Sequence, residues 1–260
     1  MRELLIEKTL LGEINKVELA IERAKAFEPN DRPYLLAFSG GKDSVAAYYI
    51  LKMAEVNFKA KYSPTSVDPP EVVRFIRKYF PDVEFEKYTE TMWELIPRKL
   101  FPPNRRGRYC CDVLKERTGE IGDTVVTGVR WEESNNRKKQ GMVGFWKGKT
   151  IVRPIIDWTS EDVWEFIRNN NIPYCELYDK GWERVGCIGC PLNSKNQAKE
   201  LEAYPAYKKL YIRAFDRMIS ERIKKGKVTT WKNGEEVMEW WINQTSKEKI
   251  EEGQCSFFGD

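Results

Sequence analysis

Four cysteines in this chain are placed so that together they can hold a metal cluster. Cys110 and Cys111 are adjacent, and Cys187 and Cys190 follow far downstream in a Gly-Cys-Ile-Gly-Cys-Pro turn. Cysteine thiolates are the usual ligands of iron–sulfur clusters. Directly adjacent ligands rarely suit a tetrahedral zinc ion held by two knuckles. The pattern therefore favours a 4Fe-4S cluster, with structural zinc and unligated or redox thiols as the alternatives.

The rest of the composition narrows the chemistry. The chain has no histidine, so imidazole cannot act as base, ligand or nucleophile partner. Residues 1–27 predict a charged amphipathic helix and not an export signal, so we expect a cytoplasmic protein in a compartment that disfavours disulfides. The apolar runs are too short for a membrane span. A formal charge of +4 is compatible with an anionic substrate or with nucleic acid.

A glycine-rich loop forms the second chemical motif. An apolar strand over residues 33–38 leads into the loop, and a helical pattern over residues 45–56 follows it. Backbone N–H groups at such a helix start can bind phosphate, although an ordinary turn that caps a helix has the same composition. The motif is not a Walker A loop. Its residues are Ser39, Gly40, Gly41, Lys42, Asp43 and Ser44.

Alternating elements after this loop predict an α/β fold. Strand patterns cover residues 57–63 and 124–129, and amphipathic helices cover residues 71–80 and 161–170. We expect an open, mainly parallel sheet with helices on both faces. Ligands bind such sheets at the carboxyl ends of the strands, which places Ser39, Asp68 and Arg130 along one rim. Asp68 is then either a ribose or metal contact or a plain turn residue.

The sequence predicts four regions. Residues 1–30 form an N-terminal helix, residues 31–195 a nucleotide-binding domain with the iron–sulfur site, residues 196–250 a small helical C-terminal region, and residues 251–260 a mobile tail. Aromatic residues in the helical region are typical of core packing, and interleaved basic residues are compatible with nucleic acid. The basic residues are Lys208, Lys209, Arg213, Arg217, Arg222, Lys224 and Lys225.

Together these motifs resemble the phosphoadenosine/adenosine phosphosulfate (PAPS/APS) reductase family of the adenine-nucleotide alpha hydrolase superfamily. The resemblance covers most of residues 32–192. The SGGKDS loop is similar to the PP-loop of ATP pyrophosphatases, and TSVDPPEVVRFI is similar to a segment that lines the adenosine pocket. RYCCDVLKE and IPYCELYDKGWERVGCIGCP resemble the two cysteine motifs of the cluster, and TGVRWEESNNR resembles a segment that faces phosphate or sulfate.

The resemblance implies a role for each motif. It implies a 4Fe-4S cluster on the four cysteines, an adenine nucleotide over the PP-loop, and Arg130 and Arg137 near the reacting anion. Two guanidinium groups seven residues apart could clamp phosphate or sulfate, while surface charge is the alternative for both. Lys42 and Asp43 are the candidate catalytic residues of the loop.

The chain also departs from the reductases. These enzymes use a nucleophilic cysteine in a C-terminal ECGxH-like motif, whereas here the tail reads EEGQCSFFGD and has no histidine. Cys255 lies in the corresponding place and is the candidate nucleophile. The intact PP-loop points instead to ATP, because Lys42 has a role only where pyrophosphate must be stabilised.

Three functions remain open from the sequence. In the first, favoured slightly, ATP and Mg²⁺ are used to adenylate a substrate for sulfur insertion, as in nucleic-acid thiolation or DNA phosphorothioation, with a cysteine desulfurase as sulfur donor. In the second, PAPS or APS is reduced to sulfite with a thioredoxin-like reductant. In the third, the chain is a non-catalytic nucleotide and redox sensor. The QCSFF tail weakly resembles a sliding-clamp peptide, and a homodimer is compatible with the sequence.

Overall fold

The computed structural model describes residues 5–9 and 12–246, which form two compact units. The sheet unit comprises the described parts of Met1–Pro64, Asp68–Tyr88 and Lys115–Gly186. The helical unit comprises the described parts of Thr65–Val67, Thr89–Leu114 and Cys187–Asp260. This division differs from the boundaries expected from the sequence, because residues 89–114 belong with the C-terminal helices.

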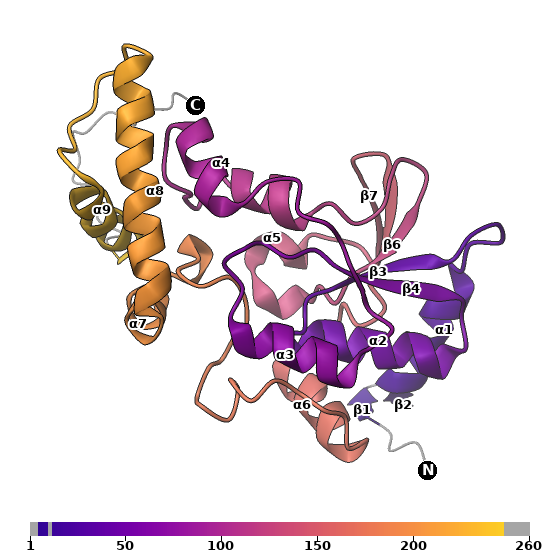
Figure 1. Ribbon diagram of the computed structural model, residues 1–260. Helices are drawn as coiled ribbons and strands as arrows, with labels where there is room; N and C mark the ends of the chain where they lie inside the picture. Colours follow the sequence, from indigo (N-terminus) through magenta and orange to yellow (C-terminus); the bar gives the residue numbers. More distant parts are fainter. Residues whose placement is uncertain (1–4, 10–11, 247–260) are drawn as a thin grey trace. The chain divides into compact units, whose positions relative to one another are not determined.

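The sheet unit is built on a six-stranded sheet (Figure 1). Neighbouring strands are parallel, except that β7 runs antiparallel to β8 at one edge. The chain segments that follow the parallel strands therefore emerge at one edge of the sheet, where ligands bind in such folds. The expected α/β class is confirmed. In spatial order the strands are β5 (Glu84–Phe85), β4 (Phe58–Tyr62), β3 (Tyr34–Phe38), β6 (Thr124–Val126), β8 (Lys149–Val152) and β7 (Val143–Trp146).

Side chains of the central strands alternate between two apolar layers. Leu36 and Val126 lie in the main core with the helices, whereas Leu35 and Val125 form a small cluster on the other face. This is the period-two pattern of a strand buried on both sides. In the main core α2 packs against α1 and α6, and α3 contributes Val72, Phe75 and Ile76. These helices are α1 (Lys16–Ala26), α2 (Lys42–Ala54), α3 (Pro70–Tyr79) and α6 (Ser160–Asn169).

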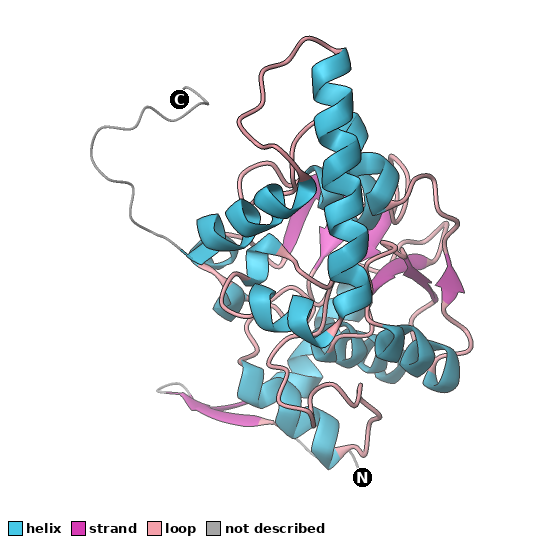
Figure 2. Ribbon diagram, turned by 60° about the vertical axis from the view of Figure 1, so that its left-hand side comes forward, coloured by secondary structure: helices cyan, strands magenta, loops and turns pink. Residues whose placement is uncertain are grey.

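The N-terminal segment corrects one expectation. Residues 1–30 were expected to be helical, but β1 (Ile6–Thr9) and β2 (Gly12–Asn15) pair as an antiparallel hairpin that is separate from the main sheet (Figure 2). Helix α1 begins only after Asn15, whose side chain accepts the N–H groups of Val17 and Glu18. Gly12 has a φ of +126°, which a helix does not allow. The cap and this glycine explain why the helix does not extend further toward the N-terminus.

The helical unit packs around one aromatic core. Tyr211, Phe215 and Trp241 are buried and lie in ring contact, and the Trp241 indole donates a hydrogen bond to the carbonyl of Pro103. The aromatic residues are therefore core packing, as expected. Within the described residues no helix is long and apolar enough to cross a membrane. The helices of this unit are α4 (Met92–Lys99), α7 (Gln197–Ala203), α8 (Pro205–Lys224) and α9 (Gly234–Ser246).

Candidate functional site

The glycine loop joins the carboxyl end of β3 to the first residue of α2. Gly40 has a φ of +73°, and a Cβ at this position would lie 3.0 Å from a methyl group of Val72 on α3. Both the backbone conformation and the packing therefore require glycine. The Ser44 hydroxyl closes the loop, because it accepts the N–H of Ser39 at 3.2 Å and donates to the carbonyl of Gly41 at 2.9 Å.

Helix α2 starts without a capping side chain. Gly41 is the N-cap residue and provides no side-chain oxygen. The N–H of Lys42 donates instead to the Tyr178 hydroxyl at 2.9 Å. Uncapped N–H groups and the helix dipole both favour an anion at such a helix start. The predicted phosphate loop thus has the local geometry that its sequence indicates.

Asp43 holds two cations at the start of α2. The Lys42 ammonium lies 3.0 Å from Asp43 Oδ1, and the Arg130 Nε donates to the same oxygen at 2.7 Å. Lys42 and Arg130 are only 6% and 4% exposed. The loop and the TGVR segment, which are far apart in the sequence, therefore meet through this carboxylate.

Arg130 is fixed on its other side as well. Its NH1 donates to Glu132 at 2.8 Å and to the carbonyl of Trp158 at 3.1 Å. Burial alone lowers the pKa of Arg130, but Asp43 and Glu132 outweigh burial and the pKa is raised. The hydrogen bond from Arg130 lowers the pKa of Glu132 in return. Arg130 is therefore a fixed, permanent cation beside the loop.

Gly128 lets the segment after β6 lie directly on the loop. A Cβ at this position would lie 2.5 Å from the carbonyl oxygen of Asp43 and 2.9 Å from the Ser44 nitrogen. No side chain fits against backbone at that distance. Sequence reasoning missed this role, although Gly128 stands two residues before Arg130 in a motif that it did single out.

We expect Gly128→Ala to destabilise the sheet unit by about 1–3 kcal/mol, because backbone must move to admit the methyl group. The same movement displaces Asp43, so affinity for a nucleotide at the loop should fall. Thermal unfolding and ATP titration measure the two effects. Gly107→Ala is the matched control, because a Cβ there meets only Asn104 at 3.4 Å. Equal behaviour of the two variants would show that the close approach is not needed.

A small cavity lies beside the loop in the sheet unit. Its volume is about 50 Å³, so a nucleoside fits only if the cavity widens. Ser39 and Asp68 both line it, which brings these two predicted residues together. Sequence reasoning missed Ser63 and Thr118, whose hydroxyl oxygens lie 3.5 Å apart on the same wall. The position of Ser63 directly after β4 was the available signal.

Arg137 is connected to Arg130 through one carboxylate. It lies on the short helix α5 (Asn135–Lys138), and its Nε is 3.6 Å from Glu133 Oε2. The other oxygen of Glu133 accepts the backbone N–H of Arg130 at 2.8 Å. The two arginines of the predicted clamp thus belong to one charged network, but Arg137 is the more exposed of the two.

The four predicted cluster cysteines all belong to the helical unit. Cys110 and Cys111 lie at the start of a π-helical turn, Cys111–Lys115, and Cys187 and Cys190 lie in the loop before α7. All four are half-buried, whereas Cys175 is buried in the sheet unit. Cys110 and Cys187, one from each pair, both pack against the hydrophobic core of this unit. The fold therefore places both cysteine pairs in one unit.

Hydrogen bonds fix the turn that carries the second pair. The N–H of Gly189 donates to Glu200 at 2.8 Å, and the Tyr211 hydroxyl donates to the carbonyl of Ile188 at 3.0 Å. Gly189 has a φ of +70°, and a Cβ there would lie 2.9 Å from Leu201. The Thr65 hydroxyl lies 3.4 Å from the Cys187 sulfur. The buried core of the helical unit therefore positions this turn.

The donor set of four thiols is of the kind that binds an iron–sulfur cluster. The hydrogen bond with Cys111, burial and the neighbouring thiols raise the pKa of Cys110 far above its usual range, so cluster binding must displace protons. All cysteines among the described residues are free thiols. Among the described residues, the four cysteines included, no three Cys, Asp or Glu side chains are grouped closely enough to hold a metal ion.

A comparison with protein families now identifies the chain. Residues 33–193 match the family described as the phosphoadenosine phosphosulfate reductase domain, which is more than half of the sequence. The chain belongs to this family. The resemblance inferred from the motifs is therefore confirmed.

Relatives of this family member include proteins with and without an assigned activity. An uncharacterized protein of Methanocaldococcus jannaschii is 29% identical over 60% of this chain, and the match spans 40% of that relative's length. An adenosine 5'-phosphosulfate reductase of Bacillus cereus is 27% identical over 60% of this chain and 72% of its own length. A reductase of the same name from Oceanobacillus iheyensis is 45% identical over 33% of this chain and 38% of its own length.

Solved structures with a similar fold include two sulfur-related proteins. A phosphoadenylyl-sulfate reductase from Candida auris aligns over 67% of this family member and 88% of its own chain, with a TM-score of 0.49 and 19% identity. The U34-tRNA thiolase NcsA from Methanococcus maripaludis, with its 4Fe-4S cluster, aligns over 87% of this family member and 86% of its own chain, with a TM-score of 0.44 and 11% identity. Such low identities do not indicate a shared reaction.

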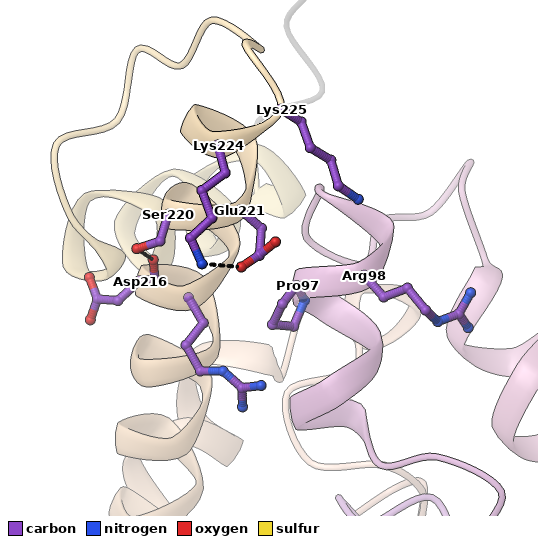
Figure 3. Close-up of a pocket in the computed structure, with 8 residues that line it drawn as sticks. Pro97, Arg98, Asp216, Ser220, Glu221, Lys224 and Lys225 are labelled. Atoms are coloured by element: carbon purple, nitrogen blue, oxygen red, sulfur yellow. Dashed lines mark hydrogen bonds and ion pairs between the residues drawn. The ribbon is translucent and has the colours of Figure 1, made fainter.

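The candidate nucleophile of the reductases and the candidate nucleic-acid surface fall in the C-terminal part of this family member. Cys255 and the QCSFF segment lie outside the described residues. In the helical unit, a groove of about 570 Å³ runs between α4 and α8 (Figure 3). Three of the predicted basic residues contribute to it. Its lining residues are Pro97, Arg98, Asp216, Arg217, Ser220, Glu221, Lys224 and Lys225.

Proposed function

We propose that this family member is an ATP pyrophosphatase that adenylates a substrate so that sulfur can replace the activated oxygen. The observation that carries this proposal is the pair of buried cations, Lys42 and Arg130, held by the single carboxylate of Asp43 at an uncapped helix start. An enzyme that releases pyrophosphate needs fixed positive charge at this place. A glycine turn that only caps a helix needs no buried lysine.

The proposed reaction has two steps. A substrate oxygen attacks the α-phosphorus of ATP, the bond to the β-phosphate oxygen breaks, and pyrophosphate leaves. The terminal sulfur of a persulfide donor, of the kind that a cysteine desulfurase provides, then displaces AMP, which carries the activated oxygen, and a second thiol cleaves the S–S bond to the donor by forming a disulfide with it, so that one sulfur stays on the acceptor. The loop N–H groups and Lys42 stabilise the leaving group, and Arg130 holds Asp43 in place. Mg²⁺ would be bound by the phosphates, with Asp43 as the available carboxylate.

We assign the adenosine part of ATP to the cavity beside the loop. Ser39 and Asp68 line it, and the hydroxyl groups of Ser63 and Thr118 add polar contacts. Asp68 provides a carboxylate of the kind that binds a ribose hydroxyl. Since the cavity measures only about 50 Å³, binding must widen it.

We assign the 4Fe-4S cluster to Cys110, Cys111, Cys187 and Cys190. Bound there, with one cysteine on each iron and no open iron site, it would complete the fold of the helical unit and supply electrostatic stabilisation. Thr65 lies 3.4 Å from the Cys187 sulfur and would orient that ligand.

The groove on the helical unit favours nucleic acid as the acceptor. Residues 205–232 contain nine lysines and arginines and two acidic residues. Both acids already have partners, because Asp216 accepts the N–H of Gly234 and Glu221 pairs with Lys224. Arg98, Arg217 and Lys225 also line the groove. A row of exposed cations beside a groove is the electrostatic pattern of a phosphodiester-binding surface.

We expect the double variant Lys224→Glu and Lys225→Glu to bind single-stranded RNA at least tenfold more weakly. Each lost phosphate contact should reduce the slope of log K against log salt by roughly 0.7. Fluorescence anisotropy over a salt series measures both quantities. The double variant Lys25→Glu and Lys78→Glu is the control, since it also reverses two charges, at exposed positions of α1 and α3 in the sheet unit. If both proteins show the wild-type slope, the groove does not bind nucleic acid.

The reaction itself is tested by anaerobic purification followed by parallel assays. One assay contains bulk RNA or DNA, a persulfide donor, a thiol reductant and ATP labelled at the α-phosphate or, in a parallel sample, at the γ-phosphate, and the other contains PAPS or APS with thioredoxin. We expect AMP and pyrophosphate in equal amounts in the first, dependent on the nucleic acid. Sulfite in the second, with no AMP in the first, would overturn the proposal.

The second candidate function is reduction of PAPS or APS to sulfite. The observation that favours it is the set of relatives named adenosine 5'-phosphosulfate reductase, up to 45% identical over the matched segment. In this case Cys255 would attack the sulfur of the nucleotide and carry the thiosulfonate. Cys255→Ser should then abolish sulfite release, and undiminished release would rule out that role.

A further inference from the structure

Strand β7 forms one edge of the six-stranded sheet (Figure 1). Within the described part of the chain it pairs with β8 alone, so its outer side faces no further strand. Lys147 and Gly148 join the two strands in a two-residue turn with φ angles of +50° and +75°, the geometry of a tight hairpin. Edge strands usually carry charged residues or proline that prevent pairing with another chain, but β7 reads Val-Gly-Phe-Trp. This edge is therefore open to a partner.

Two aromatic side chains at the hairpin tip, residues 145–148, are exposed. Phe145 is 83% exposed and Trp146 is 54% exposed, whereas the tyrosines of the inner strands β3 and β4 are buried. Phe145 is paired with Thr150 and Trp146 with Lys149, so the two rings lie on opposite faces of the hairpin. Neither ring belongs to a hydrophobic cluster of the described residues. Neighbouring large rings that remain in water are typical of a binding surface.

A neighbouring loop of the sheet unit anchors the hairpin tip. The N–H of Gly122 donates to the carbonyl of Gly148 at 2.9 Å, and a Cβ at Gly148 would lie 3.1 Å from the side chain of Ile121. Ile121 is itself 84% exposed, so it adds a third apolar side chain to this surface. The tip is thus held in place, and it presents Phe145 and Trp146 to solvent.

The segment that contains the hairpin is strongly basic. Residues 134–156 include six lysines and arginines and no aspartate or glutamate. The Lys147 ammonium lies 5.7 Å from the centre of the Trp146 ring, within the range of a cation–π contact. The adjoining loop contributes two acids, Glu120 and Asp123, of which Asp123 pairs with Arg32 at 3.2 Å. The local charge therefore remains positive. The exposed lysines of the segment are Lys138, Lys139 and Lys147.

This charge decides which partner fits the open edge. Pairing of two copies along β7 would bring together two segments with six cations each and no acid, and their repulsion opposes such a dimer. A polyanion is attracted by the same charge. Aromatic rings beside cations are the combination that binds single-stranded nucleic acid, because unpaired bases stack on the rings. In a duplex the bases already stack on one another and offer no such contact.

We propose that the hairpin tip binds single-stranded nucleic acid, with bases stacked on Phe145 and Trp146 and with phosphates neutralised by Lys147 and the lysines before β7. The contact involves neither the glycine loop and its cations nor the groove of the helical unit. Its role rests on the proposed function, in which the hairpin holds the acceptor strand and selects strands whose bases are unpaired. The binding itself does not depend on that function.

Binding is measured without ATP or a sulfur donor. Wild type, Phe145→Ala, Phe145→Leu, Phe145→Trp and Lys147→Gln are titrated with a fluorescent single-stranded oligonucleotide over a salt series. Phe145→Ala and Phe145→Leu should each bind at least fivefold more weakly with the wild-type salt slope, because a stacked base releases no counterion. Phe145→Trp should bind at least as tightly as wild type. Lys147→Gln should instead reduce the slope of log K against log salt by roughly 0.7.

An abasic oligonucleotide shows whether the lost contact is a stacked base. Wild type should prefer the normal strand over the abasic strand, and this preference should be at least fivefold smaller in Phe145→Ala. Tyr79→Ala is the matched control, since it removes another exposed aromatic side chain, 46% exposed on α3 of the sheet unit, and should bind like wild type. Because Phe145 lies outside the hydrophobic clusters, its variants should unfold at the wild-type temperature.

Several results would overturn the proposal. Wild-type affinity in Phe145→Ala removes the contact, and wild-type affinity in Phe145→Leu shows that the ring does not stack. An equal loss on normal and abasic strands does the same. If sedimentation shows that wild type self-associates and Phe145→Ala does not, with unchanged affinity for the oligonucleotide, the hairpin is an interface between copies.

The two proposals fail in different ways. If no AMP is formed from ATP but Phe145→Ala still loses oligonucleotide affinity, the binding site stands and its role as holder of the acceptor is wrong. If AMP is formed and the Phe145 variants bind and react like wild type, the proposed reaction stands and the hairpin contact is wrong.

Discussion

Replacing Lys42 with methionine is expected to lower ATP cleavage by about 10²–10³-fold, the usual effect of removing one group that stabilises developing charge. The ammonium lies at the first residue of α2, is held by Asp43 at 3.0 Å, and is almost fully buried. Methionine keeps the length of the side chain but cannot neutralise pyrophosphate. Most of the loss should therefore appear in the rate of AMP release at saturating ATP.

The control for Lys42→Met is Lys42→Arg, which keeps the charge but places it on a larger, planar group. We expect the Lys42→Arg protein to be more active than the Lys42→Met protein and less active than wild type. Asp43 keeps Arg130 as a partner at 2.7 Å in both variants, so we expect both proteins to fold. Thermal unfolding checks this expectation. If the Lys42→Met protein cleaves ATP at the wild-type rate, the loop does not stabilise pyrophosphate and the proposed function is wrong.

The loop was predictable because its chemistry is local. Strand, glycine turn and helix follow one another within residues 33–56, and each carries its own signal in the sequence. The strand patterns over residues 57–63 and 124–129 were confirmed as β4 and β6 for the same reason. Parallel strand order then placed Ser39 and Arg130 at one edge.

What could not be predicted depends on contacts between distant segments. Gly128 has the same sequence context as any turn glycine, and only its 2.5 Å approach to Asp43 shows why it is needed. Phe145 stands in an apolar strand of the kind that is usually buried, and only its 83% exposure shows otherwise. The placement of Cys110 and Cys111 in the helical unit likewise follows from packing, because Cys110 lies against the hydrophobic core of that unit, and not from any composition shift.

Cys187→Ser is expected to remove most of the iron and sulfide from protein purified without oxygen. In the proposed cluster site the thiolate of Cys187 is a ligand, and a serine hydroxyl is a poor replacement for it. Metal and sulfide analysis and visible absorbance measure the loss. Because the Cys187–Cys190 turn packs on Tyr211 and Leu201, the helical unit should also unfold at a lower temperature.

The matched control is Cys175→Ala, which alters a cysteine buried in the sheet unit. It should keep the full iron content and lose only packing energy, about 1 kcal/mol. Equal iron in Cys187→Ser and wild type would remove Cys187 from the ligand set.

ATP binding by Cys187→Ser distinguishes two roles of the cluster, since the PP-loop belongs to the sheet unit. Retained ATP affinity with lost sulfur transfer would place the cluster in the second step of the reaction, whereas loss of both would give it a role in maintaining the fold.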